Sequence, residues 1–239
     1  METVLCCAVA VGGATVIGTF IGFIWRRGAE RHARAILSIS AGIMLAAAAE
    51  SLISPSFSGG GAGIIGAVIG IFFGAAALFG AERLMPLSSY DASGRSALLF
   101  AIAVAVHNLP EGLAAGLGFA SGSTEDALAV TIGIALHNIP EGMIAVFPLL
   151  AAGVPPTRAL LLSLSGGAAE VAGTVIGYLA LGYIDGILPL ALSFAGGTML
   201  YVILEEMIPE GHLGGRRRSS FLMILGYAIM MSLKVIIGG

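Results

Sequence analysis

The chain has 239 residues, of which 57% are hydrophobic and 10% are charged, with a formal net charge of −3 at pH 7. A water-soluble domain carries about 25% charged residues, so this composition excludes that class and predicts an all-α integral membrane protein. The lipid bilayer is therefore an expected partner, whereas a nucleic acid is not.

Eight apolar stretches are long enough to cross a membrane as helices, because one crossing needs roughly 20 apolar residues. Together they fill the chain, so we expect a single transmembrane transporter domain over residues 1–239. The expected spans are about 3–24, 35–54, 61–81, 97–120, 127–151, 157–181, 187–208 and 219–238.

Glycines recur every four residues inside these stretches, a spacing typical of helices that pack closely in lipid. We expect such contacts at four sets of glycines: Gly18/Gly22, Gly66/Gly70/Gly74, Gly112/Gly116 and Gly173/Gly177.

Basic residues occupy alternate loops between the expected spans. Ten of the eleven Lys and Arg residues lie in or directly beside alternate loops: nine fall between spans 1 and 2, 3 and 4, or 7 and 8, and Arg158 is at the edge of span 157–181 next to the loop between spans 5 and 6. By the positive-inside rule these loops face the cytoplasm and both termini face outside. The expected location is the inner (plasma) membrane of the cell, crossed many times.

Spans 97–120 and 127–151 contain the same polar phrase, thirty residues apart. The copies read His107-Asn108-Leu109-Pro110-Glu111-Gly112 and His137-Asn138-Ile139-Pro140-Glu141-Gly142. On a helix, His and Glu four positions apart share one face, and the Pro frees a carbonyl oxygen one turn earlier. Imidazole, carboxylate and amide ligands favour a divalent ion such as Zn²⁺, Fe²⁺ or Mn²⁺.

The two phrases lie in neighbouring spans that run in opposite directions, with three further spans on either side. This predicts a 3+2+3 inverted-repeat bundle of eight transmembrane helices, a plan common among transporters.

The expected spans also contain six glutamates, whereas Lys234 is the one Lys or Arg residue in them apart from Arg158 at the edge of span 157–181. An excess of carboxylates in lipid indicates a mobile cation. Glu170 lies in the middle of span 157–181 and joins the two phrases as a candidate ligand. Glu50, Glu205 and Glu206 lie near span ends, where a carboxylate often only reaches the headgroups, and their role in the path, like that of His212, stays open.

The candidate ligands outnumber the four that one tetrahedral zinc ion needs. We therefore hypothesise two ions about 3.5–4 Å apart, bridged by Glu111 and Glu141. The ligands of this hypothesis are His107, Asn108, Glu111, His137, Asn138, Glu141 and Glu170.

Three functions compete for these residues. The main one is a carrier of divalent metal, with no prosthetic group and no enzymatic activity. The alternative is a metal-dependent integral-membrane enzyme, which would retain its metal rather than release it. A carrier of organic cations would need aromatic cages, and aromatic residues make up only 7% of the chain. A P-loop and a His-Glu-x-x-His motif are both absent from the sequence, which weighs against ATP as the energy source and against a zinc protease.

With these motifs, the chain resembles the bacterial branch of the ZIP family of divalent-metal transporters. The resemblance rests on the two phrases, on Glu170 and on eight spans with both termini outside. It implies import of Zn²⁺, or of Fe²⁺, Mn²⁺ or Cd²⁺, into the cytoplasm along a path between spans 2, 4, 5 and 7. It also implies a homodimer, the metal ligands named above, and Met44 as a further ligand.

The sequence departs from the family pattern at several positions. Asn138 stands where some relatives have Asp, which makes the site less negative. Val171 follows Glu170, where a proline is frequent in relatives. Glu205-Glu206 replaces the His-Glu pair often found near the inner exit, and the loop between spans 3 and 4, histidine-rich in many relatives, contains no histidine.

Overall fold

The computed structural model describes residues 1–57, 60–84, 108–121, 124–151, 154–183 and 187–238. Within these ranges the chain is almost wholly helical and has no β-strand, which confirms the predicted all-α class. Seven of the eight expected spans appear as helices long and apolar enough to cross a membrane. The remaining one, 97–120, lies partly outside the described residues. The seven spans are Glu2–Ile24, His32–Ser56, Gly63–Ala81, Ala127–Phe147, Pro156–Ala180, Leu188–His212 and Arg216–Ile237.

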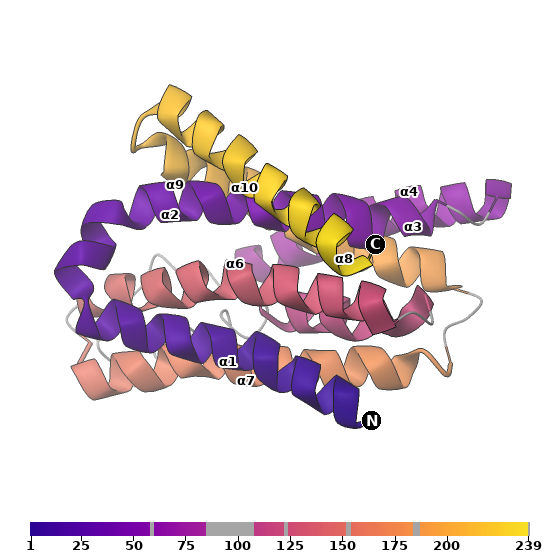
Figure 1. Ribbon diagram of the computed structural model, residues 1–239, viewed down its shortest axis with the longest axis horizontal. Helices are drawn as coiled ribbons and strands as arrows, with labels where there is room; N and C mark the ends of the chain where they lie inside the picture. Colours follow the sequence, from indigo (N-terminus) through magenta and orange to yellow (C-terminus); the bar gives the residue numbers. More distant parts are fainter. Residues whose placement is uncertain (58–59, 85–107, 122–123, 152–153, 184–186, 239) are drawn as a thin grey trace.

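The long helices run back and forth along one axis, and the two termini lie toward the same end of the bundle (Figure 1). The starts of α2 (Arg26–Ala47) and α10 (Arg216–Gly238) lie at the opposite end. Residues 108–117 are also helical and lead into the short 3-10 helix η2 (Gly118–Ser121). The long helices are α1 (Glu2–Ile24), α2 (Arg26–Ala47), α4 (Gly60–Leu84), α6 (Thr124–Ala151), α7 (Pro156–Ala180), α8 (Leu188–Val202) and α10 (Arg216–Gly238).

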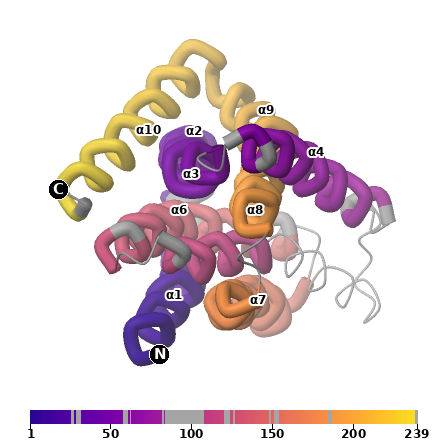
Figure 2. Tube along the Cα trace, turned by 90° about the vertical axis from the view of Figure 1, so that its right-hand side faces the viewer, coloured from indigo at the N-terminus to yellow at the C-terminus, as the bar shows by residue number. Residues whose placement is uncertain are grey.

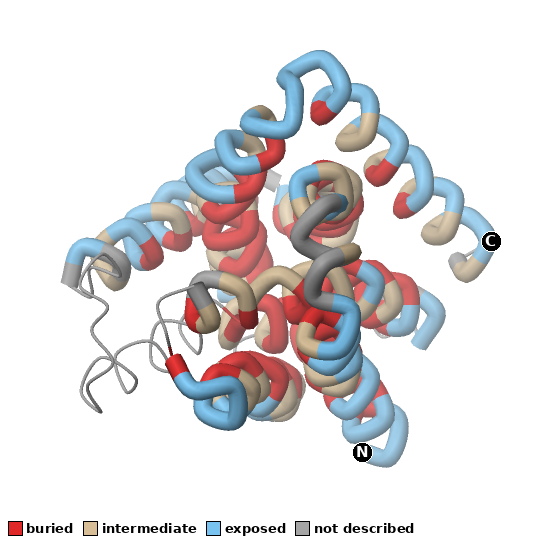
Figure 3. The backbone as a smooth tube through the Cα atoms, turned by 90° about the vertical axis from the view of Figure 1, so that its left-hand side faces the viewer, coloured by how far each residue is buried: buried red, intermediate tan, exposed pale blue. Residues whose placement is uncertain are grey.

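Helix α6 lies in the middle of the bundle and packs against α1, α2 and α7 (Figure 2). Helix α4 covers α8 on one side, and α10 leans on α2 on another. Exposed residues gather on the outward sides of the peripheral helices, and buried residues gather toward the centre (Figure 3). In a bilayer the exposed apolar side chains of α4 and α10 face lipid, so the polar residues in the centre need partners within the protein.

Glycines set the close approach of the helices. A Cβ at Gly18 or Gly22 of α1 would collide with backbone carbonyl oxygens of α6, and a Cβ at Gly173 or Gly177 of α7 with those of residues 109 and 113. Similar collisions would occur at Gly70, Gly74, Gly112 and Gly116. Gly66 has open space instead, so a close contact at that glycine was wrongly expected.

Two spans change from an α-helix to a wider π turn before a proline. Helix α2 continues into η1 (Ala48–Ile53) and α3 (Ser54–Ser56), and helix α8 continues into η4 (Ile203–Met207) and α9 (Ile208–His212). Pro55 and Pro209 follow directly after the residue that closes each turn. Proline has no N–H, and its ring clashes with the carbonyl four residues earlier. The wider turn relieves that clash, and π turns of this kind are frequent at functional sites.

Candidate metal centre

Three helical segments bring most of the expected ligands into the centre of the bundle. Segment 108–117 carries Asn108 and Glu111, α6 carries His137, Asn138 and Glu141, and α7 carries Glu170. The glycine that ends each phrase allows neighbouring helices to come this close. A Cβ at Gly112 would collide with the carbonyl oxygen of Glu170, and one at Gly142 with that of Thr15. The glycines therefore allow α7 and α1 to approach the two phrases.

Glu111, His137 and Glu141 form one group, with one ligand atom from each lying within 4.8 Å of the others. The Nε2 atom of His137 lies 2.8 Å from Oε2 of Glu141 and 3.4 Å from Oε1 of Glu111. Glu111 and His137 are both 1% exposed, while the side chain of Glu141 is 21% exposed. Two carboxylates and an imidazole so arranged offer the nitrogen and oxygen ligands that zinc binds.

Ser40 of α2 holds the other nitrogen of the His137 ring. Its Oγ lies 2.6 Å from Nδ1 and also donates a hydrogen bond to the backbone carbonyl of His137 at 3.2 Å. Ser40 is fully buried. A partner at Nδ1 fixes the orientation of the ring and directs Nε2 toward the carboxylates, as the outer partner of a metal-ligating histidine does.

Glu170 forms a second group with side chains from α1 and segment 108–117. The Thr15 hydroxyl lies 2.7 Å and 2.8 Å from the two carboxylate oxygens, and the Asn108 amide donates to Oε1 at 2.5 Å. Glu170 is fully buried and lies close enough to Glu111 and Glu141 to interact with them electrostatically. The two groups are therefore neighbours in one polar interior.

Asn138 is fully buried beside these groups. Its amide donates to the carbonyl of Val11 at 3.4 Å, whereas its Oδ1 accepts no hydrogen bond from the described residues. A buried amide oxygen without a donor is costly unless something binds it. The donor side of Asn138 thus faces α1, and its oxygen is left without a donor among the described residues.

The other two expected ligands, Met44 and His107, do not belong to the groups around His137 and Glu170 that the structure describes. Met44 of α2 is 1% exposed and belongs to the apolar core, together with Ala114 and Ala115 of segment 108–117. His107 lies outside the described residues.

Three carboxylates with so little solvent need compensation from positive charge, because an unpaired charge in low-dielectric surroundings costs several kcal/mol. Among the described residues, His137 lies beside Glu111 and Glu141, and Glu170 accepts hydrogen bonds from the Thr15 hydroxyl and the Asn108 amide. A divalent cation would balance the remaining negative charge, which is the chemistry expected of the repeated phrases.

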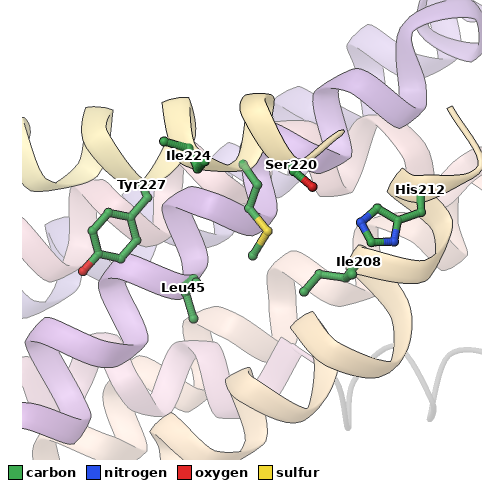
Figure 4. Close-up of a pocket in the computed structure, with 7 residues that line it drawn as sticks. Leu45, Ile208, His212, Ser220, Ile224 and Tyr227 are labelled. Atoms are coloured by element: carbon green, nitrogen blue, oxygen red, sulfur yellow. The ribbon is translucent and has the colours of Figure 1, made fainter. Parts of the chain in front are cut away.

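A pocket elsewhere in the bundle contains none of these residues. It has a volume of about 340 Å³ and opens between α2, α9 and α10 (Figure 4). Its lining is mostly apolar, with Leu45, Ile208, Met223 and Ile224 beside the polar groups of His212, Ser220 and Tyr227. The His137 and Glu170 groups are therefore separate from this peripheral cavity.

Thr15 and Ser40 were not predicted from the sequence. Most hydroxyl groups in these spans bond to a carbonyl of their own helix, as Thr19, Thr131 and Thr174 do. A Ser or Thr within an apolar stretch is therefore weak evidence for a site. Only the approach of α1 and α2 to α7 and α6 distinguishes Thr15 and Ser40 from the rest.

Comparison with known proteins adds an independent line of evidence. A family model described as ZIP Zinc transporter matches residues 86–234, which is more than half of the chain. The chain is 31% identical over 247 residues to the protein named Zinc transporter ZIPB of Bordetella bronchiseptica, covering 94% of this chain and 78% of that protein.

Two further relatives match over shorter regions. Identity to Zinc transporter GufA of Myxococcus xanthus is 42% over 144 residues, or 60% of this chain and 57% of the relative. Identity to Zinc transporter ZIP11 of Homo sapiens is 42% over 153 residues, or 61% of this chain and 45% of the relative. The chain thus spans about half the length of these two proteins. All three are named transporters, and none is named an enzyme.

Proposed function

The chain belongs to the ZIP family of zinc transporters, and on this premise we propose that it carries divalent metal ions across a membrane. The observation that carries the proposal is the buried group of Glu111, His137 and Glu141 at the centre of a bundle of apolar helices. A carrier needs a polar site that is shielded from lipid and yet able to release its cargo. We propose Zn²⁺ as the main cargo, with Fe²⁺, Mn²⁺ and Cd²⁺ as further candidates.

We propose the whole chain as one domain in the inner (plasma) membrane, with eight spans in a 3+2+3 arrangement and both termini outside. The position of both termini toward one end of the bundle (Figure 1) supports an even number of spans. Import toward the cytoplasm along spans 2, 4, 5 and 7, and a homodimer, complete the proposal.

The proposed site holds two ions. One lies between Glu111, His137 and Glu141, whose ligand atoms already face each other. The other uses Glu170 and the amide oxygens of Asn108 and Asn138, with Glu111 and Glu141 as bridges. His107 and Met44 are proposed as further ligands. To bind the second ion, Asn108 must turn its oxygen rather than its amide hydrogens toward the metal, because only the oxygen can ligate it.

Uptake into liposomes tests the function. The purified protein should admit Zn²⁺ down a gradient, and Fe²⁺, Mn²⁺ and Cd²⁺ should be compared side by side under the same conditions. Dialysis should then remove the bound metal, because a carrier exchanges its cargo. Metal that stays bound at a fixed stoichiometry, with no uptake of any of the four ions, would refute transport.

Counting bound ions tests the two-ion site. Glu170→Gln should leave one ion bound near His137, whereas Glu141→Gln should remove both ions because it removes a bridging carboxylate. Anomalous diffraction or calorimetry can count the ions. A single ion in the unmodified protein, still bound in Glu170→Gln, would contradict the second site.

A further inference from the structure

Lys234 is the one lysine in the sequence, and its side chain reaches from α10 to the π turn η1. Its Nζ donates a hydrogen bond to the backbone carbonyl of Glu50 at 2.9 Å and lies 3.8 Å from the Glu50 carboxylate. The two side chains are 32% and 36% exposed. A lysine within an apolar span is expensive unless it has a partner, and here its shortest contact is to the backbone rather than to the carboxylate.

The backbone at this point lacks a donor of its own. In η1 the N–H of Ser54 donates to the carbonyl of Ala49, five residues earlier. The next bond of this pattern would join residue 55 to the carbonyl of Glu50, but Pro55 has no N–H. The Lys234 ammonium group donates to the carbonyl that this N–H would have bonded. A carbonyl without a donor is costly in the membrane, so this bond completes the turn.

The second π turn, η4, also lacks a backbone N–H because of a proline, but it has no lysine to replace it. In η4 the N–H of Ile208 donates to the carbonyl of Ile203, and Pro209 comes next. Pro209 therefore leaves the carbonyl of Leu204 in the position that Glu50 has in η1. Since Lys234 is the only lysine of the chain, η4 provides an internal comparison that has the proline but no lysine.

The turn also faces the apolar core on its other side. Ala48 and Leu52 of η1 are at most 1% exposed and belong to the same core cluster as Met44 and Met199 of α8. Met44 lies one helical turn before Ala48 on the same span. The bond from Lys234 thus holds one face of η1 while the opposite face lines the interior next to a proposed metal ligand.

We propose that Lys234 is a positioning residue for transport, which supplies the hydrogen bond that Pro55 cannot make and so holds the π turn η1 in the shape that the metal path requires. The inference rests on the proposed transport function. It assigns the effect to the carbonyl bond rather than to the ion pair, because an ion pair that is about a third exposed contributes little.

Uptake and metal binding of Lys234→Met are the first measurement. Methionine keeps most of the apolar stem but has no donor. The maximal uptake rate should fall about tenfold, which corresponds to about 1.4 kcal/mol, the low end for a hydrogen bond to a charged group. The affinity of the buried site for Zn²⁺ in detergent should stay within about twofold, because none of its ligands contacts Lys234 among the described residues.

Two control variants separate the carbonyl bond from the ion pair. Lys234→Arg should recover most of the uptake rate, and Glu50→Gln should keep the uptake rate of the unmodified protein. A Glu50→Gln loss as large as that of Lys234→Met would overturn the inference.

A double-mutant cycle with Pro55 is the decisive test. Pro55→Ala restores a backbone N–H, so the further loss caused by Lys234→Met should shrink to about twofold or less in that background. When Lys234→Met is combined with Pro209→Ala, which alters η4 instead of η1, the loss of uptake rate caused by Lys234→Met should remain about tenfold. Equal losses in both backgrounds would refute the role of Lys234.

The coupling between Lys234 and Pro55 in this cycle can also be measured from melting temperatures, which do not depend on transport. If the unmodified protein moves no metal, the proposed function fails while the coupling of Lys234 to Pro55 can still be measured. Coupling in stability without any change in uptake rate would show a purely structural bond and would also overturn the positioning role.

Discussion

Replacing Ser40 by alanine should weaken zinc binding although Ser40 is not a proposed ligand. A hydroxyl has one proton, and the carbonyl oxygen of His137 can only accept. When Ser40 donates to that carbonyl, its Oγ must accept the Nδ1 hydrogen of the ring 2.6 Å away. This arrangement leaves Nε2 as the nitrogen for the metal, and any proton on Nε2 is released when the metal binds.

The size of the effect follows from the burial of this bond. Ser40 is fully buried and His137 is 1% exposed, so the Ser40→Ala variant leaves a buried N–H without an acceptor. Such a loss costs about 1–3 kcal/mol, and changes at the outer partner of a ligating histidine typically weaken metal affinity about 10- to 100-fold. We expect the Kd for Zn²⁺ to rise at least about tenfold.

Calorimetry of the purified protein in detergent measures this Kd, with Ser38→Ala as the matched control. Ser38 lies on the same helix, is also buried, and bonds to Ser219 and to the carbonyl of Arg34 rather than to the metal centre. It should lower the melting temperature but leave the Kd unchanged. Equal affinity in Ser40→Ala and the unmodified protein, or the same loss in Ser38→Ala, would refute the reasoning.

Two further predictions concern packing and topology. Gly142→Ala should destabilise the protein by about 1–3 kcal/mol and weaken binding of the ion proposed at Glu170, because the new Cβ collides with the carbonyl of Thr15 and displaces α1. Gly13→Ala is the control, because a Cβ at that position of α1 meets open space. Equal melting temperatures of the two variants would contradict the expectation. In a variant without Cys6 and Cys7, single cysteines can be placed at two exposed positions, Thr157 in the first turn of α7 and Tyr183 in the turn that follows α7. A cysteine at 157 should be labelled only from the cytoplasm, and a cysteine at 183 only from outside. Labelling of both from the same side would break the proposed topology.

The membrane spans and most of the candidate ligands follow from the sequence alone. Apolar length predicts a crossing helix whatever its neighbours are, because the lipid requires every span to satisfy its own backbone. The two phrases are equally local signals, since polar side chains in mid-span are costly without a function. The described structure brings Asn108, Glu111, His137, Asn138, Glu141 and Glu170 into one buried region.

The tertiary structure alone decided which groups pair with which. Ser40, Thr15 and Lys234 are ordinary residues of their own helices, and their partners lie 97, 155 and 184 positions away in the chain. Periodicity reports which face of a helix a side chain occupies, but not which helix that face meets or at what height. Here the contact heights depend on where glycines let backbones touch and on two π turns that shift the register of their spans. For this reason the sequence could indicate the candidate metal ligands, whereas the hydroxyl and ammonium groups that contact them and their helices became visible only in the packed bundle.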